Sequence, residues 1–343
     1  MSDIRFSSRA AYQYWRLMEH IFGGGPASTR FQGQRSNIQA DVLKQLQSAG
    51  SGKIREIPRE RNISDKELKQ KYLSQGRPVI LEGRAREWPC VKRWNPQWLS
   101  EHFGSDPVSL IDASPEDMTN INYEVMNATL ADVLNAMDSG DVSKYSRFNR
   151  ILYDHPELLE DFDWRWLYKM RNLISSGNTF QVFIGGKGTR TQLHCASEHN
   201  LFTQVYGQKH WYIYSPHYDV VFDPPVTGTP YFHSAFDPDA PDFNLFPAVQ
   251  YVETWECELS PGDVLFNPPS WWHHVTNLTG SIGVGFRWFG AIDCFKISFM
   301  QALLTVGATN PPIWVAAKNR TDFATIFNYM NAKRLKREQG SGS

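Results

Sequence analysis

Residues 191–209 read TQLHCASEHNLFTQVYGQK, and residues 261–273 read PGDVLFNPPSWWH. In both stretches, short runs of apolar and aromatic residues are interrupted by Gly, Pro and Asn, a pattern typical of strands joined by tight turns. The same texture recurs at 181–184, 255–259 and 282–288. Many short strands with this punctuation predict an all-β barrel or sandwich as the core of the protein.

Helical patterns flank this core on both sides. The run Ala10–Phe22 places four apolar residues on one side at helical spacing, namely Tyr14, Leu17, Met18 and Ile21. Glycines and a proline end that run, and a second short helix is expected over 38–47. Residues 1–53 are therefore predicted to be a helical appendage and linker, which either docks on the core or contacts a partner.

The rest of the chain is predicted to form one catalytic domain and one tail. The domain is expected over 54–290, with its β-core at about 179–290. Residues 291–338 return to helical spacing, with apolar positions that include Phe295, Phe299 and Phe327. Apolar helices that follow a closed β-core can cover each other or a second subunit, so a homodimer through these helices is expected.

Composition argues against several classes of partner. The 343 residues carry a formal net charge of −1, which provides no electrostatic footprint for nucleic acid or an anionic membrane. No apolar run approaches the roughly 18 residues that a membrane span needs. The four cysteines lack a CxxC spacing and are expected to be reduced, buried thiols. A cytoplasmic protein is the resulting expectation.

Two of the ten histidines stand out by their context. His194 lies at the end of a predicted strand, and His273 follows the turn-rich segment PPSWW. A metal bound inside a β-barrel needs imidazoles from different strands that point inward, and iron readily takes such nitrogen ligands. The adjacent His274 must face the other way, because successive strand residues point to opposite faces. A hydrogen-bonded core histidine remains the alternative for either residue.

The motif set Thr191-x-x-His194, Asn200, Lys209 and PPSWW-His273 resembles that of the JmjC/cupin-8 oxygenases. The resemblance covers roughly residues 54–290, and within the family it is nearest to the asparaginyl hydroxylases that act on hypoxia-inducible factor. It implies a double-stranded β-helix (cupin or jelly-roll) core with surrounding helices. It also implies Fe(II), 2-oxoglutarate and O2 as cofactors.

The resemblance assigns roles to individual residues. His194 and His273 would be the iron ligands, Lys209 would pair with the distal carboxylate of 2-oxoglutarate, and Thr191 would hydrogen-bond the same group. Asn200 would lie near the cofactor. The chemistry agrees, because a lysine on a buried strand is costly without an anionic partner. The alternative is a surface lysine on an edge strand.

The family pattern breaks at the third ligand. Relatives carry an acid two residues after the first histidine, whereas this chain has Ala196, whose methyl group cannot bind iron. Three hypotheses follow. A chloride ion could fill the vacant position, as in iron/2-oxoglutarate halogenases, and the reaction would be radical chlorination. Water or Glu198 could complete a hydroxylase site. The protein could instead be an inactive cupin that only binds ligands. Cys195 is a poorer ligand candidate, because its strand parity sends it to the opposite face.

The substrate is less well defined by the sequence. Gly283 and Gly285 share one strand parity, which indicates either close approach of a ligand or a bend of the barrel. The segment 216–250 is rich in acidic and aromatic residues, and it could form a rim for a cationic substrate or a solvated loop. Arg190 and Arg287 are candidates for binding a substrate carboxylate. A small molecule, an amino acid or a peptide is expected as the substrate.

Overall fold

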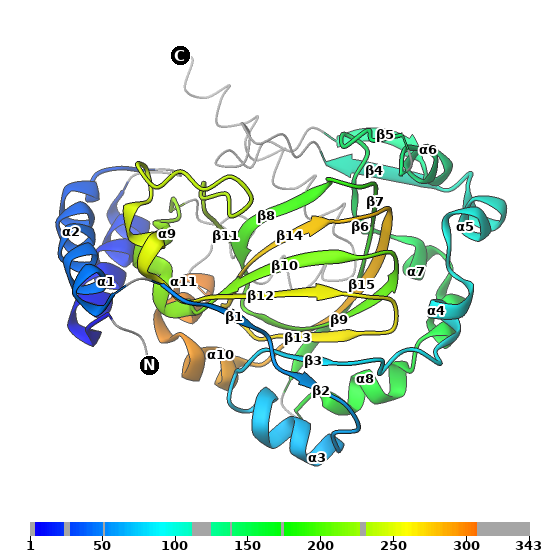
Figure 1. Cartoon of the computed structure of the whole chain (residues 1–343), viewed down its shortest axis with the longest axis horizontal. Helices are drawn as coiled ribbons and strands as arrows, with labels where there is room; N and C mark the ends of the chain where they lie inside the picture. The colour runs from blue at the N-terminus through cyan, green and yellow to red at the C-terminus, as the bar shows by residue number, and fades with distance from the viewer. Residues whose placement is uncertain are drawn as a thin grey trace.

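The computed structural model describes residues 4–23, 28–50, 52–111, 125–137, 139–172, 175–226 and 231–306. Two large sheets face each other across the core (Figure 1). In spatial order, the first sheet contains β1 (Ile54–Glu56), β12 (Thr254–Leu259), β10 (Lys209–Tyr214), β14 (Trp272–Asn277), β8 (Arg190–Cys195) and β11 (Phe232–His233). The second contains β2 (Arg59–Glu60), β3 (Val79–Leu81), β13 (Val264–Asn267), β9 (Glu198–Tyr206), β15 (Ser281–Phe289), β7 (Ser176–Gly185) and β6 (Ser146–Asn149).

The strand pairing confirms the predicted jelly-roll core with surrounding helices. Neighbouring strands of both sheets run antiparallel, apart from the parallel edge pairs β1–β12 and β2–β3. The two inner faces meet in an apolar cluster with members from both sheets, including Phe183, Phe202, Leu265, Trp211 and Val275. Alternate residues of a strand point to the same face, so the residues two positions before and after each of these also face the interior.

Helices cover the outer face of the second sheet. They are α3 (Asp65–Leu68), α4 (Pro89–Arg93), α5 (Pro96–Phe103), α6 (Leu130–Ala136), α7 (Ile151–Asp154) and α8 (Trp164–Met170). Their apolar side chains join outward residues of β7, β9, β13 and β15 in the largest core cluster, as Trp166, Leu201 and Phe286 illustrate. A small separate sheet of β4 (Pro107–Ile111) and β5 (Val125–Thr129) lies beside α6.

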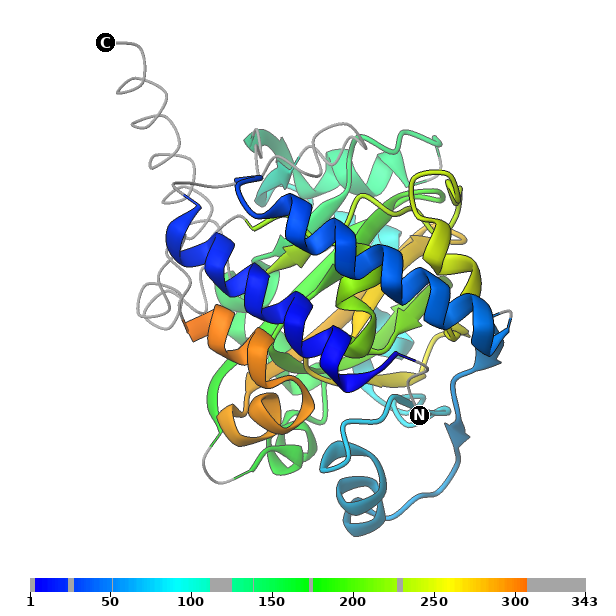
Figure 2. The same ribbon diagram turned by 90° about the vertical axis from the view of Figure 1, so that its left-hand side faces the viewer.

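The N-terminal helices dock on the core. Figure 2 shows α1 (Phe6–Phe22) and α2 (Gln32–Ala49) lying side by side across one end of the barrel, with α11 (Phe299–Val306) next to α1. Tyr12, Val42 and Leu46 share a buried cluster with Phe222 of α9 (Asp219–Phe222) and with Trp272 of β14. The predicted linker at 48–53 is shorter than expected, because α2 continues to Ala49.

The buried face of α1 differs from the predicted one. Tyr14 and Ile21, expected to face inward, are 51% and 54% exposed. The buried positions are mostly polar: Ser8, Tyr12, Gln13, Arg16 and Glu19. Apolar periodicity was misleading here because hydrogen bonds and charge, rather than an apolar stripe, attach this helix to the core.

A polar cluster behind β14 makes this attachment. The carboxylate of Asp219 is buried and accepts hydrogen bonds from Gln13 of α1, from Trp272 Nε1 at 2.7 Å and from Gln301 Nε2 of α11 at 2.6 Å. Arg16, with no exposed surface, adds its positive charge and lies 4.9 Å above the Phe232 ring. Burial raises the pKa of Asp219 to about 6, and the charge of Arg16 opposes that rise.

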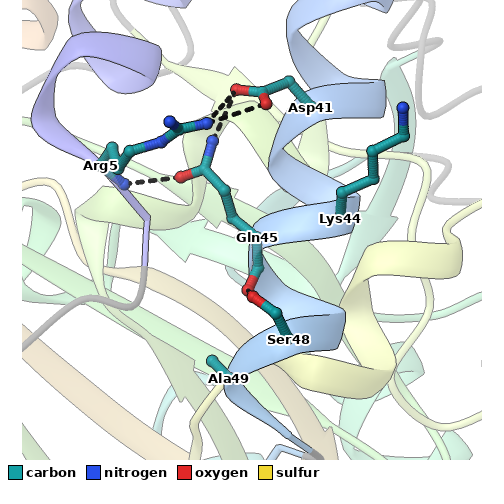
Figure 3. A pocket seen from close by; sticks show the side chains of 6 residues that line it. All are labelled: Arg5, Asp41, Lys44, Gln45, Ser48 and Ala49. Carbon is teal, nitrogen blue, oxygen red and sulfur yellow. Dashed lines mark hydrogen bonds and ion pairs between the residues drawn. The ribbon is translucent and has the colours of Figure 1, made fainter.

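At the surface, an ion pair joins the start of α1 to α2. Arg5 Nη2 donates to Asp41 Oδ1 at 2.9 Å, and the Arg5 amide donates to Gln45 Oε1 at 2.9 Å. These residues line a surface pocket together with Lys44, Ser48 and Ala49 (Figure 3). No predicted site residue lines this pocket.

The C-terminal segment begins with α10 (Ala291–Ile297), which is followed by α11. Phe299 is 60% exposed and Ile292 is 51% exposed. The homodimer through these helices stays a prediction. The helix expected around 323–330 lies outside the described residues. Among the helices that the structure describes, none is long and apolar enough to cross a membrane.

The buried charge network predicts a large loss of stability on removal of Asp219. In Asp219→Ala, the buried donors Trp272 Nε1 and Gln301 Nε2 would lose their acceptor, and each unpaired buried donor costs about 1–3 kcal/mol. Denaturant-induced unfolding measures the difference. Asp41→Ala is the control, because it breaks an exposed ion pair of the N-terminal helices and should change stability little. Equal losses in the two variants would contradict the role given to Asp219.

Candidate metal and cofactor site

Two histidines face each other on neighbouring strands of the first sheet. The antiparallel pairing of β14 with β8 places His273 directly opposite His194. Their side chains therefore share one face of the sheet, and the ring centroids lie 4.1 Å apart. Both are buried, with 9% and 3% exposure for His194 and His273. The structure thus brings the two predicted metal ligands together.

Backbone carbonyls set the tautomer of both rings. His194 Nδ1 lies 2.7 Å from the carbonyl oxygen of Gln192, and His273 Nδ1 lies 3.0 Å from that of Trp271. A carbonyl oxygen can only accept, so each Nδ1 carries the proton and donates it. The lone pair is then on Nε2 in both rings, which is the orientation that second-shell hydrogen bonds impose on metal-binding histidines. Asn267 Nδ2 also lies 3.1 Å from His273 Nδ1, but it cannot donate to that nitrogen while Nδ1 itself donates to the Trp271 carbonyl.

Burial also keeps these imidazoles neutral. It lowers the pKa of His194 well below the ordinary value, and the neighbouring His273 contributes to that shift. It lowers the pKa of His273 to about 3. Metal ions bind the neutral form of histidine, so both rings are available as ligands at neutral pH.

His274 points to the outer face of the sheet, as strand alternation requires. Its Nε2 lies 3.0 Å from Asp239 Oδ2, and Asp237 is also near. The donor atoms of these three residues lie within 4.8 Å of one another. Asp237 also pairs with Arg190 at 2.8 Å. Arg190 is therefore engaged on the outer face, and its predicted role in binding a substrate carboxylate has no support.

The residues around the missing acid lie in a break between strands. β8 ends at Cys195, and the Ala196 carbonyl accepts a hydrogen bond from the Ser270 amide at 2.7 Å. The parity argument for Glu198 assumed a continuous strand, but Glu198 begins β9 in the other sheet. Its Oε2 lies 3.8 Å from Arg287 Nη1, and burial raises its pKa. The charge of Arg287 opposes that rise in the pKa of Glu198. The role of Glu198 as an iron ligand stays a prediction.

Cys195 faces away from the two histidines. Its sulfur lies 3.5 Å from Gln301 Nε2 in the outer cluster beside Asp219. Burial raises its pKa well above the ordinary value, and Asp219 contributes. All four cysteines are unpaired and buried, as the sequence predicts.

A buried ammonium lies deeper between the sheets. Lys209 has no exposed surface, and its Nζ donates to Asn277 Oδ1. No described carboxylate pairs with it, and burial alone lowers its pKa to about 7. Thr191 lies on β8, on the other side of β14 from Lys209, and its hydroxyl is 3.2 Å from the Tyr145 hydroxyl. The Tyr145 ring is 5.8 Å from Lys209 Nζ.

Other polar atoms on the inner faces also lack partners. Within the described residues, no hydrogen bond reaches the amide of Asn200, the amide of Gln181, Trp211 Nε1 or Arg287 Nε. The register places Arg287 opposite both Asn200 and Thr179, on the same face as Phe202. Buried polar groups without partners are rare in native proteins, so this cluster indicates a site for a polar ligand.

Sequence reasoning missed several residues of this site. Tyr145 comes from outside the predicted β-core, and no local pattern singles it out. Asn277 belongs to a sequon, but it is 2% exposed and holds Lys209. Asn267 and His233 also went unnoticed. His233 is on β11 and lies directly opposite His194 of β8. β11 has only two residues, which is too short for a sequence pattern to reveal the strand.

The two glycines and the acidic segment have structural explanations. A Cβ on Gly283 would meet Phe202 Cζ at 2.3 Å, and one on Gly285 would meet Asn200 Oδ1 at 2.8 Å. Both glycines therefore make room for inner side chains of the protein. In the segment 216–250, Phe222 and Phe236 are buried beneath the N-terminal helices. They do not form the predicted substrate rim.

Comparison with known proteins agrees with this architecture. A family model described as a Cupin-like domain matches residues 65–293, which include the described strands of both sheets apart from β1 and β2. The chain belongs to the Cupin-like domain family. The JmjC/cupin-8 resemblance is thereby confirmed at the family level, while the likeness to the asparaginyl hydroxylases stays a prediction.

This Cupin-like protein is similar to proteins named as a demethylase, a tRNA wybutosine-synthesizing protein and a lysyl hydroxylase. Lysine-specific demethylase 8 of Xenopus tropicalis is 29% identical over 238 residues, which are 68% of this chain and 52% of the relative. The tRNA wybutosine-synthesizing protein 5 of Danio rerio is 28% identical over 255 residues, which are 68% of this chain and 75% of that protein. The human bifunctional peptidase and (3S)-lysyl hydroxylase is 24% identical over 264 residues, or 68% and 83% of the two chains. The chain spans about half the length of the first of these relatives.

The inner histidine pair of this Cupin-like domain predicts a specific loss of metal binding. His194→Ala and His273→Ala should each weaken Co(II) binding by at least about 100-fold, since even second-shell changes cost 10- to 100-fold. Calorimetric titration of the metal-free protein measures the affinity. The control is His210→Ala. His210 is on the outer face of β10, beside Glu256 of β12. Unchanged affinity in both inner variants would contradict the assignment.

Proposed function

We propose that this protein is an Fe(II)/2-oxoglutarate-dependent oxygenase that oxidises a C–H bond of an amino acid or peptide, with hydroxylation as the outcome. The observation that supports it most directly is the buried Lys209, which has no described carboxylate partner. It lies beyond a pair of histidines whose Nε2 lone pairs are free to bind metal. Iron bound at these histidines would supply the activation of O2 that couples decarboxylation of 2-oxoglutarate to substrate oxidation.

The inner residues fit a dicarboxylate cofactor. A carboxylate at Lys209 would replace a costly isolated ammonium by a charge-assisted hydrogen bond. The Thr191 and Tyr145 hydroxyls lie on the same side and can donate to the same group. The amides of Asn200 and Gln181 remain to bind the rest of the cofactor or the substrate. Lys209, Thr191 and Tyr145 would hold the distal carboxylate of 2-oxoglutarate, and the metal at the histidines would bind its keto-acid group.

The substrate side is defined by Arg287 and Glu198. Both are on the inner face, and the guanidinium helps to lower the pKa values of His194 and His273. A cation and an anion 3.8 Å apart suit a zwitterionic amino acid or the backbone of a peptide. The names of the relatives refer to lysine residues and to a tRNA nucleoside. An amino-acid or peptide substrate agrees with the two names that refer to lysine.

The central test combines spectroscopy with one variant. Without oxygen, Fe(II) and 2-oxoglutarate should produce a visible metal-to-ligand charge-transfer band. Lys209→Met should weaken 2-oxoglutarate binding roughly 10- to 100-fold, since hydrogen bonds to charged groups are worth about 1.5–3 kcal/mol. Lys44→Met, on the exposed side of α2, is the matched control. Absence of the band from the metal-loaded protein would favour the inactive binding protein instead.

Binding of 2-oxoglutarate should depend on pH through Lys209. In the protein without 2-oxoglutarate, burial lowers the pKa of Lys209 to about 7. A bound carboxylate would raise this pKa again. Binding then takes up a proton above pH 7, so Kd should rise up to about tenfold per pH unit there and stay flat just below. Calorimetry in buffers with different ionisation enthalpies measures that uptake. A pH-independent affinity without proton uptake would contradict the pairing.

Chlorination is the second candidate, and Ala196 is the observation that favours it. The side chain of this residue is a methyl group, with 7% of the residue exposed, where relatives carry an acidic ligand. If chloride completes the metal site, titrating chloride should shift the charge-transfer band of the wild-type protein. A band that does not respond to chloride, with normal 2-oxoglutarate binding, rules out the halogenase and leaves the hydroxylase.

A further inference from the structure

His233 completes a row of three histidines across the first sheet. β11 pairs with β8, so that His233 is directly opposite His194, and β8 pairs with β14, so that His194 is directly opposite His273. Residues directly opposite in antiparallel strands project from the same face, about 5 Å apart. The three imidazoles therefore project together on the face that carries the proposed metal.

The ring geometry is close to that of a three-nitrogen metal centre. With metal–nitrogen bonds of about 2.0–2.1 Å, the ring centroids of two ligands lie roughly 4.5–5.2 Å apart. The observed separations are 4.1 Å for His194–His273 and 5.7 Å for His194–His233. The donor nitrogens of all three do not lie within 4.8 Å of one another. The His194–His233 rings lie 19° from parallel, and the His233 ring must reorient and move roughly 0.5–1.2 Å closer to reach the ligand range.

No hydrogen bond among the described residues fixes the His233 ring, whereas its backbone is held by hydrogen bonds of the next residue. The Ser234 amide donates to the Leu193 carbonyl at 2.9 Å, and the Ser234 hydroxyl donates to the Phe222 carbonyl at 2.8 Å. Phe232 lies beneath Arg16 of α1. The backbone of β11 is therefore fixed against β8. Metal binding would require a change only in the side-chain torsions of His233.

We propose that His233 is the third metal ligand of this protein and replaces the acid that is missing at Ala196. This inference rests on the proposed function, because it concerns the same iron. Glu198 is the competing candidate: its Oε2 lies 3.8 Å from Arg287 Nη1 and makes no hydrogen bond within the described residues. Three protein nitrogens and a chelating keto acid fill five of six positions, which leaves one for O2 and none for chloride. The proposal therefore favours hydroxylation over chlorination.

The test counts imidazoles and measures affinity with Co(II) and Fe(II). In wild-type protein, X-ray absorption fine structure should show three imidazoles around the metal. His233→Ala should show two, with binding at least about 10-fold weaker. His210→Ala should behave as wild type. Only in His233→Ala should chloride shift the spectrum of the metal with 2-oxoglutarate.

A second variant separates ligation from a structural role. Adding Ala196→Asp to His233→Ala supplies an acid at the position that relatives use, and this should restore affinity if both side chains serve one coordination position. Two outcomes overturn the proposal: unchanged metal affinity and imidazole count in His233→Ala, or two imidazoles and a carboxylate in wild type that Glu198→Gln removes. A wild-type protein that binds neither metal nor 2-oxoglutarate would instead overturn the proposed function.

Discussion

The antiparallel pairing of β8 with β14 is the constraint on which the site depends. Its register places His194 opposite His273, and an irregularity between His273 and Val275 then brings Thr191 onto the same side. Without that irregularity, the odd spacing of Thr191 and His194 would send them to opposite faces. A proposed metal ligand, His194, and a proposed cofactor contact, Thr191, thus come from one strand because the pairing is locally irregular.

Polar contacts on the outer face of the first sheet stabilise this strand pairing. Trp272 precedes His273 and donates to Asp219, which also accepts from α1 and α11. The N-terminal helices therefore stabilise the strand that carries the proposed ligand His273. Arg16 packs on Phe232, next to His233. The appendage and the barrel form one structural unit around the site, although the family match covers only the barrel and its nearest helices.

Inside the barrel, the chain leaves its polar groups ready for a ligand. Lys209 and Asn200 occupy the space that Gly283 and Gly285 leave beside them. A buried ammonium and unpartnered amides reduce the stability of the ligand-free protein, and proteins retain such groups where a ligand compensates them. The neutral histidines suit a metal that meets a dianionic cofactor.

The strands, the histidine pair and the buried lysine could be predicted from sequence because each rests on a local pattern or a family motif. The buried face of α1 could not, because its contacts are polar and formed with residues some two hundred positions away. The strand continuity assumed for Glu198 was wrong, because β8 ends at Cys195 and Glu198 begins β9, while its role as an iron ligand stays a prediction. His233 and Tyr145 lie outside the motifs, and only the strand register and the tertiary packing show that they belong to the site.

Anomalous diffraction at the iron edge tests the central claim most directly, with crystals grown from Fe(II) and 2-oxoglutarate in the absence of oxygen. The account predicts one iron peak at Nε2 of His194 and His273, with the distal carboxylate of 2-oxoglutarate on Lys209. An iron peak at Asp237, Asp239 and His274 on the outer face would contradict it. So would a carboxylate bound away from Lys209.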